Sequence, residues 1–252
     1  MTASDARRPV QLEIAVQDAA GARIAFEAGA DRVELCQALA ETGGLTPSAG
    51  AVEAVLAVAG RAERLAVLVR PRPGGYVYDA DEIAVVAADV REVVRRGAGA
   101  VVVGALDAAG GIDTEALSRW IDAAAGAEVV FHRAIDTLSA PVDAIDQLVA
   151  LGIRRVLTSG GATRSIDGLG TVEALVRGSA GRVQIMPGGG VRVEDVPAFV
   201  SSGADAVHLS ARRSSGDTAP SGPGGGASGF DVTDGAIVAA ARAALDEATS
   251  GS

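Results

Sequence analysis

The side chains that could carry out chemistry in this 252-residue chain are few enough to be considered one by one. It contains two histidines, His132 and His208, one cysteine, Cys36, and 22 basic residues that are all arginine. Because lysine is absent, mechanisms that need an ε-amine, such as Schiff-base formation or a phosphate-loop lysine, are excluded. The main remaining routes are proton transfer by histidine or carboxylate, and metal binding through thiolate and imidazole.

Arginines and glycine-rich turns together could bind an anion. Arg70 and Arg72 lie in the segment 70–75, and Arg133 directly follows His132. In a chain with a net charge of −10, three guanidinium groups at one rim of a fold indicate an anion site. Glycine lets backbone N–H groups approach an anion closely, and short turns of this kind follow three predicted strands. The predicted anion-binding residues are Arg70, Arg72, Arg133, Ser159, Gly160, Gly188, Gly189, Gly190 and Ser210.

A repeated glycine-containing connection, called a glycine joint below, links a helix to the next strand and indicates how these residues are positioned. Gly29, Gly97, Gly152 and Gly203 each end a helix-like segment and open a strand-like one, as expected for a left-handed helix cap followed by a buried parallel strand. Four further strands are predicted at 10–16, 65–70, 128–133 and 183–187.

Each predicted strand is followed by an amphipathic segment, so the chain alternates strand and helix throughout. This alternation over about 250 residues predicts a single-domain, closed (β/α)8 TIM-type barrel spanning 10–250. An open doubly wound sheet is the alternative, but no Gly-x-Gly-x-x-Gly fingerprint follows the first strand. The predicted helices are 18–28, 48–59, 81–96, 113–125, 141–151, 168–178, 193–202 and 233–247.

The barrel would bring several reactive side chains to one rim. In this fold chemistry takes place at the carboxyl ends of the strands, where both histidines lie. Because side chains alternate along a strand, Glu13, Glu34 and Cys36 are expected to point inward beside His208. We therefore predict Glu13, Glu34, His132 and His208 as acid–base candidates.

Composition limits the partners and the location. A net charge of −10 and a pI near 4.7 argue against nucleic acid and against a membrane surface. One cysteine cannot form an internal disulfide and no signal peptide is evident, so a cytoplasmic location is expected. Residues 1–9 are predicted to be a flexible terminus. The Gly-, Ser- and Pro-rich segment 212–230 is predicted to be a flexible loop, either a linker or a lid.

At these residues the sequence resembles the CutC copper-homeostasis family. The matching segments fall in order over about residues 10–212 and include several uncommon strings. They are 30–36 (ADRVELC), 43–48 (GGLTPS), 70–72 (RPR) with the following Gly-Gly, 131–134 (FHRA) with Asp136, 156–160 (VLTSG) and 186–190 (MPGGG).

The resemblance implies a TIM-type barrel, a cytoplasmic location and copper handling, and it adds Asp136 to the catalytic candidates. The predicted copper ligands are Cys36 and His208. Family members often carry cysteine at the position of Ala15, so this chain keeps one of two thiolates, although Met186 offers another soft donor. Cu(I) prefers two or more soft ligands, which weakens the expectation of a copper site here.

Three functions from different classes therefore remain open. The first is a copper-homeostasis protein. The second is a barrel enzyme of lyase or isomerase type that acts on a small anionic substrate, phosphorylated or not, by His/Glu acid–base chemistry. The third is a structural barrel in which Glu13, Glu34 and Arg32 or Arg70 form only an ion-pair network. The expected partner is a metal ion or a small anionic ligand, and homo-oligomerisation is left open.

Overall fold

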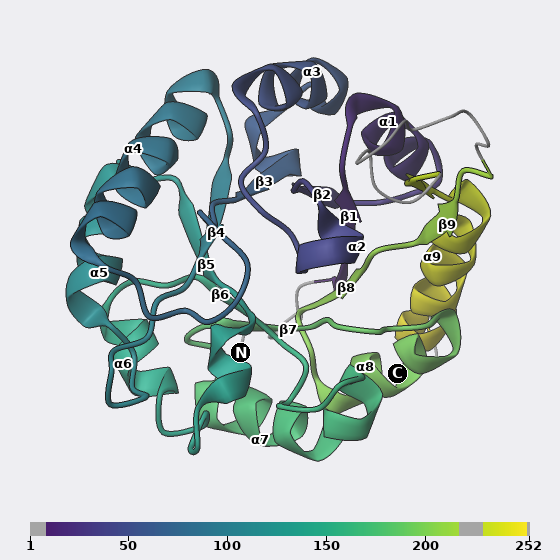
Figure 1. Ribbon diagram of the computed structural model, residues 1–252. Helices are drawn as coiled ribbons and strands as arrows, with labels where there is room; N and C mark the ends of the chain where they lie inside the picture. The colour runs from purple at the N-terminus through teal and green to yellow at the C-terminus, as the bar shows by residue number, and fades with distance from the viewer. Residues whose placement is uncertain (1–8, 217–228, 251–252) are drawn as a thin grey trace, which may run out of the picture.

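A ring of eight parallel strands forms the centre of the molecule in the computed structural model, which describes residues 9–216 and 229–250 (Figure 1). Consecutive strands are neighbours from β1 to β7, and β8 pairs with β1. The ring closes where the amide of Asp205 donates to the carbonyl of Ile185 (2.9 Å) and Gly188 bridges His208. The strands are β1 Gln11–Val16, β2 Arg32–Leu35, β3 Leu65–Leu68, β4 Ala100–Val103, β5 Glu128–Phe131, β6 Arg155–Thr158, β7 Gln184–Pro187 and β8 Ala206–Leu209.

Helices surround the strands on the outside of the ring (Figure 1). With one helix after each strand, the architecture confirms the predicted (β/α)8 barrel. The outer helices are α1 Ala19–Glu27, α3 Ala49–Ala59, α4 Ala80–Arg96, α5 Thr114–Ala123, α6 Ile145–Ala150, α7 Leu169–Ser179, α8 Val196–Ser202 and α9 Gly235–Ser250.

The predicted glycine joints have the conformation that the repeat requires. Gly29, Gly97, Gly152 and Gly203 all have positive φ, between 85° and 113°, which a residue with a Cβ adopts only with strain. Each joint turns the chain from the end of an outer helix into the next strand. The large aliphatic core between strands and helices, which contains Leu12 and Ile14, then holds the layers together.

Three segments differ from the sequence prediction. The helix expected at 141–151 is confined to Ile145–Ala150, and an additional short helix, α2 (Leu39–Thr42), lies over the strand ends near the centre of the ring (Figure 1). At the start of the predicted 212–230 loop, β9 (Arg212–Ser214) pairs antiparallel with β10 (Asp231–Thr233), which follows the loop. Residues 1–8 of the predicted flexible terminus and 217–228 of the predicted loop lie outside the described residues.

Within residues 9–216 and 229–250, no helix is both long enough and apolar enough to cross a membrane.

Candidate functional site

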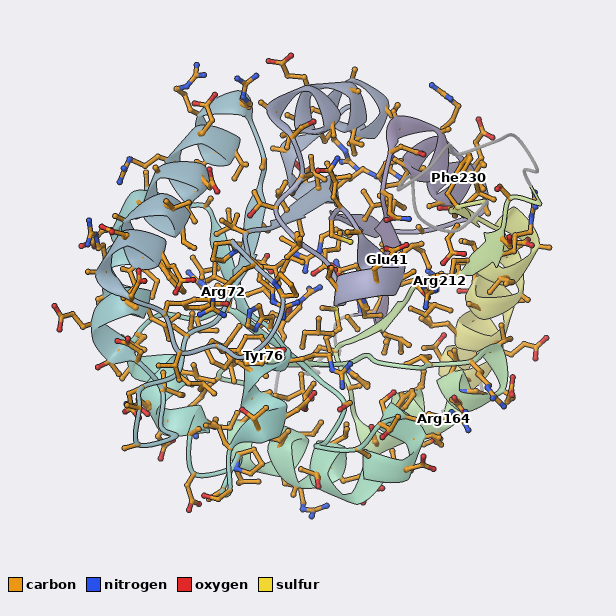
Figure 2. The ribbon with its side chains drawn as sticks, viewed as in Figure 1. Glu41, Arg72, Tyr76, Arg164, Arg212 and Phe230 are labelled. Carbon is orange, nitrogen blue, oxygen red and sulfur yellow. The ribbon has the colours of Figure 1, made fainter. Side chains whose placement is uncertain are left out.

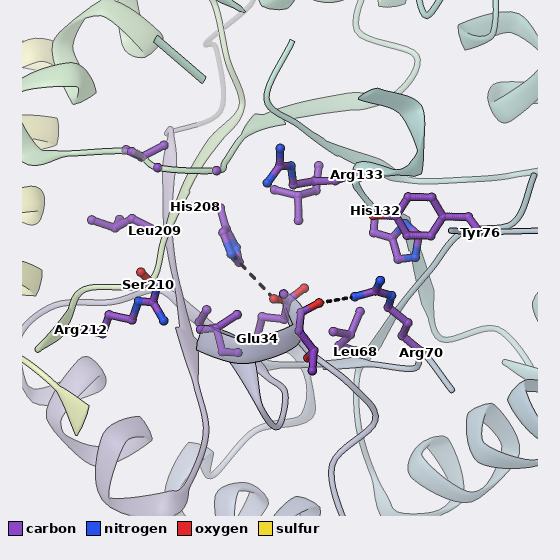
Figure 3. A pocket seen from close by; sticks show the side chains of 18 residues that line it. Glu34, Leu68, Arg70, Tyr76, His132, Arg133, His208, Leu209, Ser210 and Arg212 are labelled. Atoms are coloured by element: carbon purple, nitrogen blue, oxygen red, sulfur yellow. Dashed lines mark hydrogen bonds and ion pairs between the residues drawn. The ribbon is translucent and has the colours of Figure 1, made fainter. Parts of the chain in front are cut away.

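A cavity of about 320 Å³ opens at the carboxyl ends of the strands (Figure 3). Its wall includes Glu34 from β2, Arg70 after β3, His132 after β5 and His208 from β8. Ligand cavities in barrels of this type occupy this position. The structure therefore brings together acid–base and anion-binding candidates that lie far apart in the chain, such as Glu34 and His208.

His208 lies between two carboxyl groups. Its Nδ1 is 2.8 Å from Oε1 of Glu13, and its Nε2 is 3.7 Å from Oε2 of Glu34. Strand register explains this arrangement, because Glu13 pairs with His208 across β1 and β8, and β2 adjoins β1 on the other side. The predicted grouping of Glu13, Glu34 and His208 is what the structure shows.

The pKa values of the two carboxyl groups are shifted in opposite directions. Burial opposes ionisation of Glu13, but Arg32 and His208 hold its pKa well below the ordinary value. Burial, together with the nearby charge of Glu13, raises the pKa of Glu34 to about 7. Burial lowers the pKa of His208, but Glu34 and Glu13 outweigh this effect and raise it. Glu34 and His208 therefore form a buried pair of proton-binding groups in the cavity wall.

An ion-pair network underlies this cluster inside the barrel. Arg32 forms an ion pair with Glu13, and its Nη1 is 2.8 Å from Oε1 of Glu128. Arg155 lies 3.9 Å from carboxylate oxygens of both Glu13 and Glu128, and it also donates to Gln184. Of the internal network that the structural hypothesis expected, Glu13 and Arg32 are paired, and Arg155 and Glu128 complete it. Glu34 and Arg70, which were expected in it, take no part.

Arg70 stands apart from that network. It is 7% exposed, and its Nη atoms donate to the backbone carbonyls of Thr42 (2.8 Å), Gly44 (3.2 Å) and Gly74 (2.8 Å). Its Nε is buried without a hydrogen-bond partner, and no described carboxylate lies within ion-pair distance. Arg70 therefore brings an uncompensated positive charge to the cavity wall.

His132 is held as a neutral hydrogen-bond donor. Its Nδ1 accepts from the backbone N–H of Ala134 (3.1 Å), so the ring proton is on Nε2. Among the described residues this Nε2 is buried without a partner. Burial and the adjacent Arg70 lower the pKa of His132 to about 3. The ring of Tyr76 lies against it, 4.8 Å between centroids (Figure 3). His132 therefore fits the role of a donor to a ligand oxygen better than that of a base.

Asp136 orders the loop beside the cavity and is absent from the cavity wall. Its carboxylate accepts from Nε of Arg133 (2.9 Å), the hydroxyl of Ser159 (2.8 Å) and the hydroxyl of Thr158. Arg133 in turn lies on Gly189, where a Cβ would come within 2.9 Å of the guanidinium carbon. Asp136 is therefore placed to position Arg133 and the turn after β6.

The predicted anion-binding residues divide into two groups. Arg72 is paired with Glu82 at the start of α4, outside the cavity wall. Ser159, Gly160 and Gly188 are also absent from the cavity wall. The predicted residues that do line the cavity are Arg70, Arg133, Gly189, Gly190 and Ser210.

Several residues of the cavity wall were not among the predicted site residues, and two of them, Tyr76 and Arg212, carry polar groups at the end of long side chains. Tyr76 and Arg212 are both placed at the mouth (Figures 2 and 3). Arg212 lies beyond the end of β8, and Ala211 before it has a φ of 40°, so strand alternation does not reach it. Strand alternation does not reach Tyr76 either, because it comes from the irregular loop after β3.

Cys36 and Met186 are absent from the cavity wall that His208 lines. Cys36 is fully buried among Ala66, Leu68, Val102 and other apolar side chains, and its sulfur lies 3.9 Å from the carbonyl oxygen of Val16. Burial raises the pKa of this thiol, which disfavours the thiolate that binds metal.

Neither of the other expected donors completes a copper site. Both ring nitrogens of His208 face carboxylates, and Met186 lies in a separate apolar cluster with Leu157 and Ala206. In the described part of the chain, no three His, Cys, Asp or Glu side chains are arranged to hold a metal ion. The donor set therefore does not fit Cu(I).

The fold and the site define a (β/α)8 barrel with an arginine- and histidine-lined cavity at its carboxyl-terminal rim. The chain belongs to the CutC family, whose family model matches residues 10–213. A family protein CutC of Xanthomonas campestris pv. campestris (strain B100) is 44% identical over 206 residues, which cover 80% of this chain and 83% of the relative.

Solved structures agree with this assignment. A crystal structure of CutC from Streptococcus agalactiae matches with a TM-score of 0.74 and 33% identity, over 79% of this chain and 97% of the other. Phosphoribosyl anthranilate isomerase from Thermus thermophilus matches with a TM-score of 0.58 at 15% identity, over 94% of this chain and 99% of the other. This second likeness concerns the barrel fold alone.

Proposed function

We propose that the rim cavity binds a small oxyanion, such as a phosphate or carboxylate group of a metabolite, and that Glu34 and His208 transfer a proton to or from it. Arg70 is the observation that carries this proposal. A guanidinium group that is 7% exposed and has no described carboxylate partner is stabilised by an anion in the cavity that it lines. The reaction class that follows is a lyase or isomerase that works by acid–base chemistry.

The remaining wall is consistent with an anionic ligand. His132 offers an N–H donor that has no partner among the described residues, and Arg133 and Arg212 add further guanidinium groups to the cavity wall. Gly189 and Gly190, both with positive φ, allow backbone to approach a ligand after β7, where barrels of this type commonly bind phosphate.

Equilibrium dialysis with inorganic phosphate tests the proposal. Replacing Arg70 by glutamine removes a charge-assisted interaction of about 1.5–3 kcal/mol, so phosphate binding should weaken about 10- to 150-fold. The matched control is Arg72→Gln, two residues further on, because Arg72 is paired with Glu82 outside the cavity. Equal loss in both variants, or no phosphate binding by the natural protein, would contradict the proposal.

Copper handling, the function implied by the family resemblance and assigned to the Streptococcus agalactiae relative, is the second candidate. It is supported by family membership and opposed by the placement of Cys36, Met186 and His208. A competition titration with Cu(I) decides whether this chain binds copper through Cys36. An affinity that falls in Cys36→Ala would support copper binding, and an unchanged affinity would exclude Cys36 as a ligand. The cytoplasmic location stays a prediction from the sequence.

A further inference from the structure

The turn after β7 presents a backbone N–H group to the rim cavity. Gly189 and Gly190 form part of the cavity wall, and both have positive φ. The carbonyl oxygen of Gly189 accepts from the backbone N–H (2.8 Å) and the hydroxyl (3.0 Å) of Ser165, which is fully buried and absent from the wall. Because a trans peptide directs its C=O and the following N–H to opposite sides, the N–H of Gly190 points away from Ser165. No described residue accepts a hydrogen bond from this N–H, so it is available to a ligand.

Arg133 adds a guanidinium nitrogen to the same turn. Its Nε donates to Asp136 and its Nη2 donates to Ser159, both at 2.9 Å. These contacts hold the side chain in place and leave Nη1 without a described acceptor. A Cβ on Gly189 would come within 2.9 Å of this Nη1, so the free nitrogen lies directly on the turn. The N–H of Gly190 and Nη1 of Arg133, called the β7 donors below, therefore form a rigidly positioned pair of anion donors.

The β7 donors lie across the barrel from Arg70. In the closed ring of eight strands, β3 and β7 are four positions apart and therefore opposite each other, and Arg70 follows β3. Two consecutive side chains after β5 diverge between these sides: the ring of His132 lies against Tyr76 from the loop after β3, whereas Arg133 lies on the turn after β7 (Figure 3). The cavity therefore has two sets of donors, Arg70 with His132 on one side and the β7 donors on the other.

We propose that the ligand of the rim cavity carries two anionic groups, one bound by Arg70 and His132 and the other by the β7 donors. The inference rests on the proposed anion site and specifies its substrate class, a short-chain acid with two oxyanion groups, such as a phosphorylated carboxylic acid. A cavity of about 320 Å³ accommodates a chain of only a few carbon atoms between the two groups. Joining the groups strengthens binding, because the second contact forms within the same complex.

A homologous series of phosphonocarboxylates tests this inference on the natural protein. Phosphonoacetate, 3-phosphonopropionate and 4-phosphonobutyrate each carry two anionic groups, and the spacer grows by a methylene group at each step. Methylphosphonate carries one anionic group and is the reference. Equilibrium dialysis at constant pH and ionic strength gives the affinities. We expect one chain length to bind best, at least about tenfold more tightly than methylphosphonate.

Two variants show whether both sets of donors are used. Arg70→Gln and Arg133→Gln each remove the guanidinium group of one set. In both variants the preference for the best phosphonocarboxylate over methylphosphonate should fall to about twofold or less, because one anionic group then lacks its donor. The control Arg95→Gln, at an exposed ion pair on α4, should keep the full preference.

The possible results separate this inference from the proposed function. Equal binding of methylphosphonate and the whole series would overturn the inference while the anion site stands, and this result depends on no variant. A folded Arg133→Gln variant that keeps the full preference would also overturn it. If neither inorganic phosphate nor any phosphonate binds to the natural protein, the anion site itself is refuted, and this inference with it.

Discussion

Replacing Glu13 by glutamine probes the buried charges beneath the cavity. Glu13 is fully buried, with one oxygen 2.8 Å from Nδ1 of His208 and the other paired with Arg32 and 3.9 Å from Arg155. Glutamine keeps the shape but removes the charge. The two guanidinium groups would then share one carboxylate, that of Glu128, whose side chain is 31% exposed.

The expected effect is large because a buried cation loses its counter-ion. Breaking one partner of a buried ion pair costs about 3–5 kcal/mol. At about 2–4 °C per kcal/mol for a chain of this length, the melting temperature should fall by about 6–20 °C. Calorimetry at neutral pH measures the fall directly, and urea unfolding followed by circular dichroism gives the free energy. The control Glu53→Gln breaks an exposed ion pair and should cost at most about 1 kcal/mol.

The pH dependence of the free energy of unfolding provides a second, independent test of the same prediction. Although burial opposes ionisation, Arg32 and His208 hold the folded pKa of Glu13 below its unfolded value of 4.5. Its contribution to stability is therefore complete above about pH 4.5 and is lost as the pH falls further. The difference between the natural protein and Glu13→Gln should shrink in the same interval. A loss below about 1 kcal/mol at neutral pH, or a difference that grows in acid, would refute the reasoning.

Three further predictions concern the cavity and the cysteine. Gly104→Ala would place a Cβ 2.5 Å from Cε1 and Nδ1 of His132. We expect the free energy of unfolding to fall by about 1–3 kcal/mol and the imidazole signal of His132 to shift in NMR spectra. Unchanged imidazole signals would contradict this packing. Because His132 has a folded pKa of about 3 against 6.5 unfolded, the unfolded state binds more protons between these values, and stability should fall as the pH drops from 6.5 towards 3. His132→Gln should show a flatter acid profile in urea titrations, and an identical profile would argue against a neutral buried ring. The buried thiol of Cys36 should react with a disulfide reagent only at the rate of unfolding, and rapid reaction of the folded protein would contradict its placement.

Alternation along strands predicted part of the site correctly because it depends on backbone geometry alone. Glu13, Glu34 and His208 lie on neighbouring strands and point inward, so register brings them into contact. The barrel itself was predictable for a similar reason, since each glycine joint needs a backbone conformation that glycine adopts without strain.

Connections between strand and helix account for what the sequence did not predict. Cys36 points inward as expected, but side chains of neighbouring strands such as Ala66 and Val102 enclose the thiol, and Leu39 from the segment after β2 packs against the same cluster. Arg72 lies beyond the end of β3, where strand alternation no longer applies. It forms an ion pair with Glu82 in the first turn of α4. Neither outcome follows from local pattern, because both depend on contacts with other segments of the chain.

A purely structural interpretation of the polar interior explains the ion-pair network inside the barrel but not the arginine and histidine of the cavity wall. The network of Arg32, Arg155, Glu13 and Glu128 contains two cations and two anions, so it is internally neutral. The buried guanidinium of Arg70 is not part of this network, because it contacts backbone carbonyls and none of the network's carboxylates.

The donors at the cavity point to the same conclusion. The backbone carbonyls that Arg70 contacts could be satisfied by a neutral donor, and the partnerless N–H of His132 contributes nothing to folding. In a chain with a net charge of −10, a buried cation with no counter-ion among the described residues, beside a donor with no partner there, is disfavoured unless an anion binds. The cavity is therefore better explained as a ligand site than as a by-product of barrel packing.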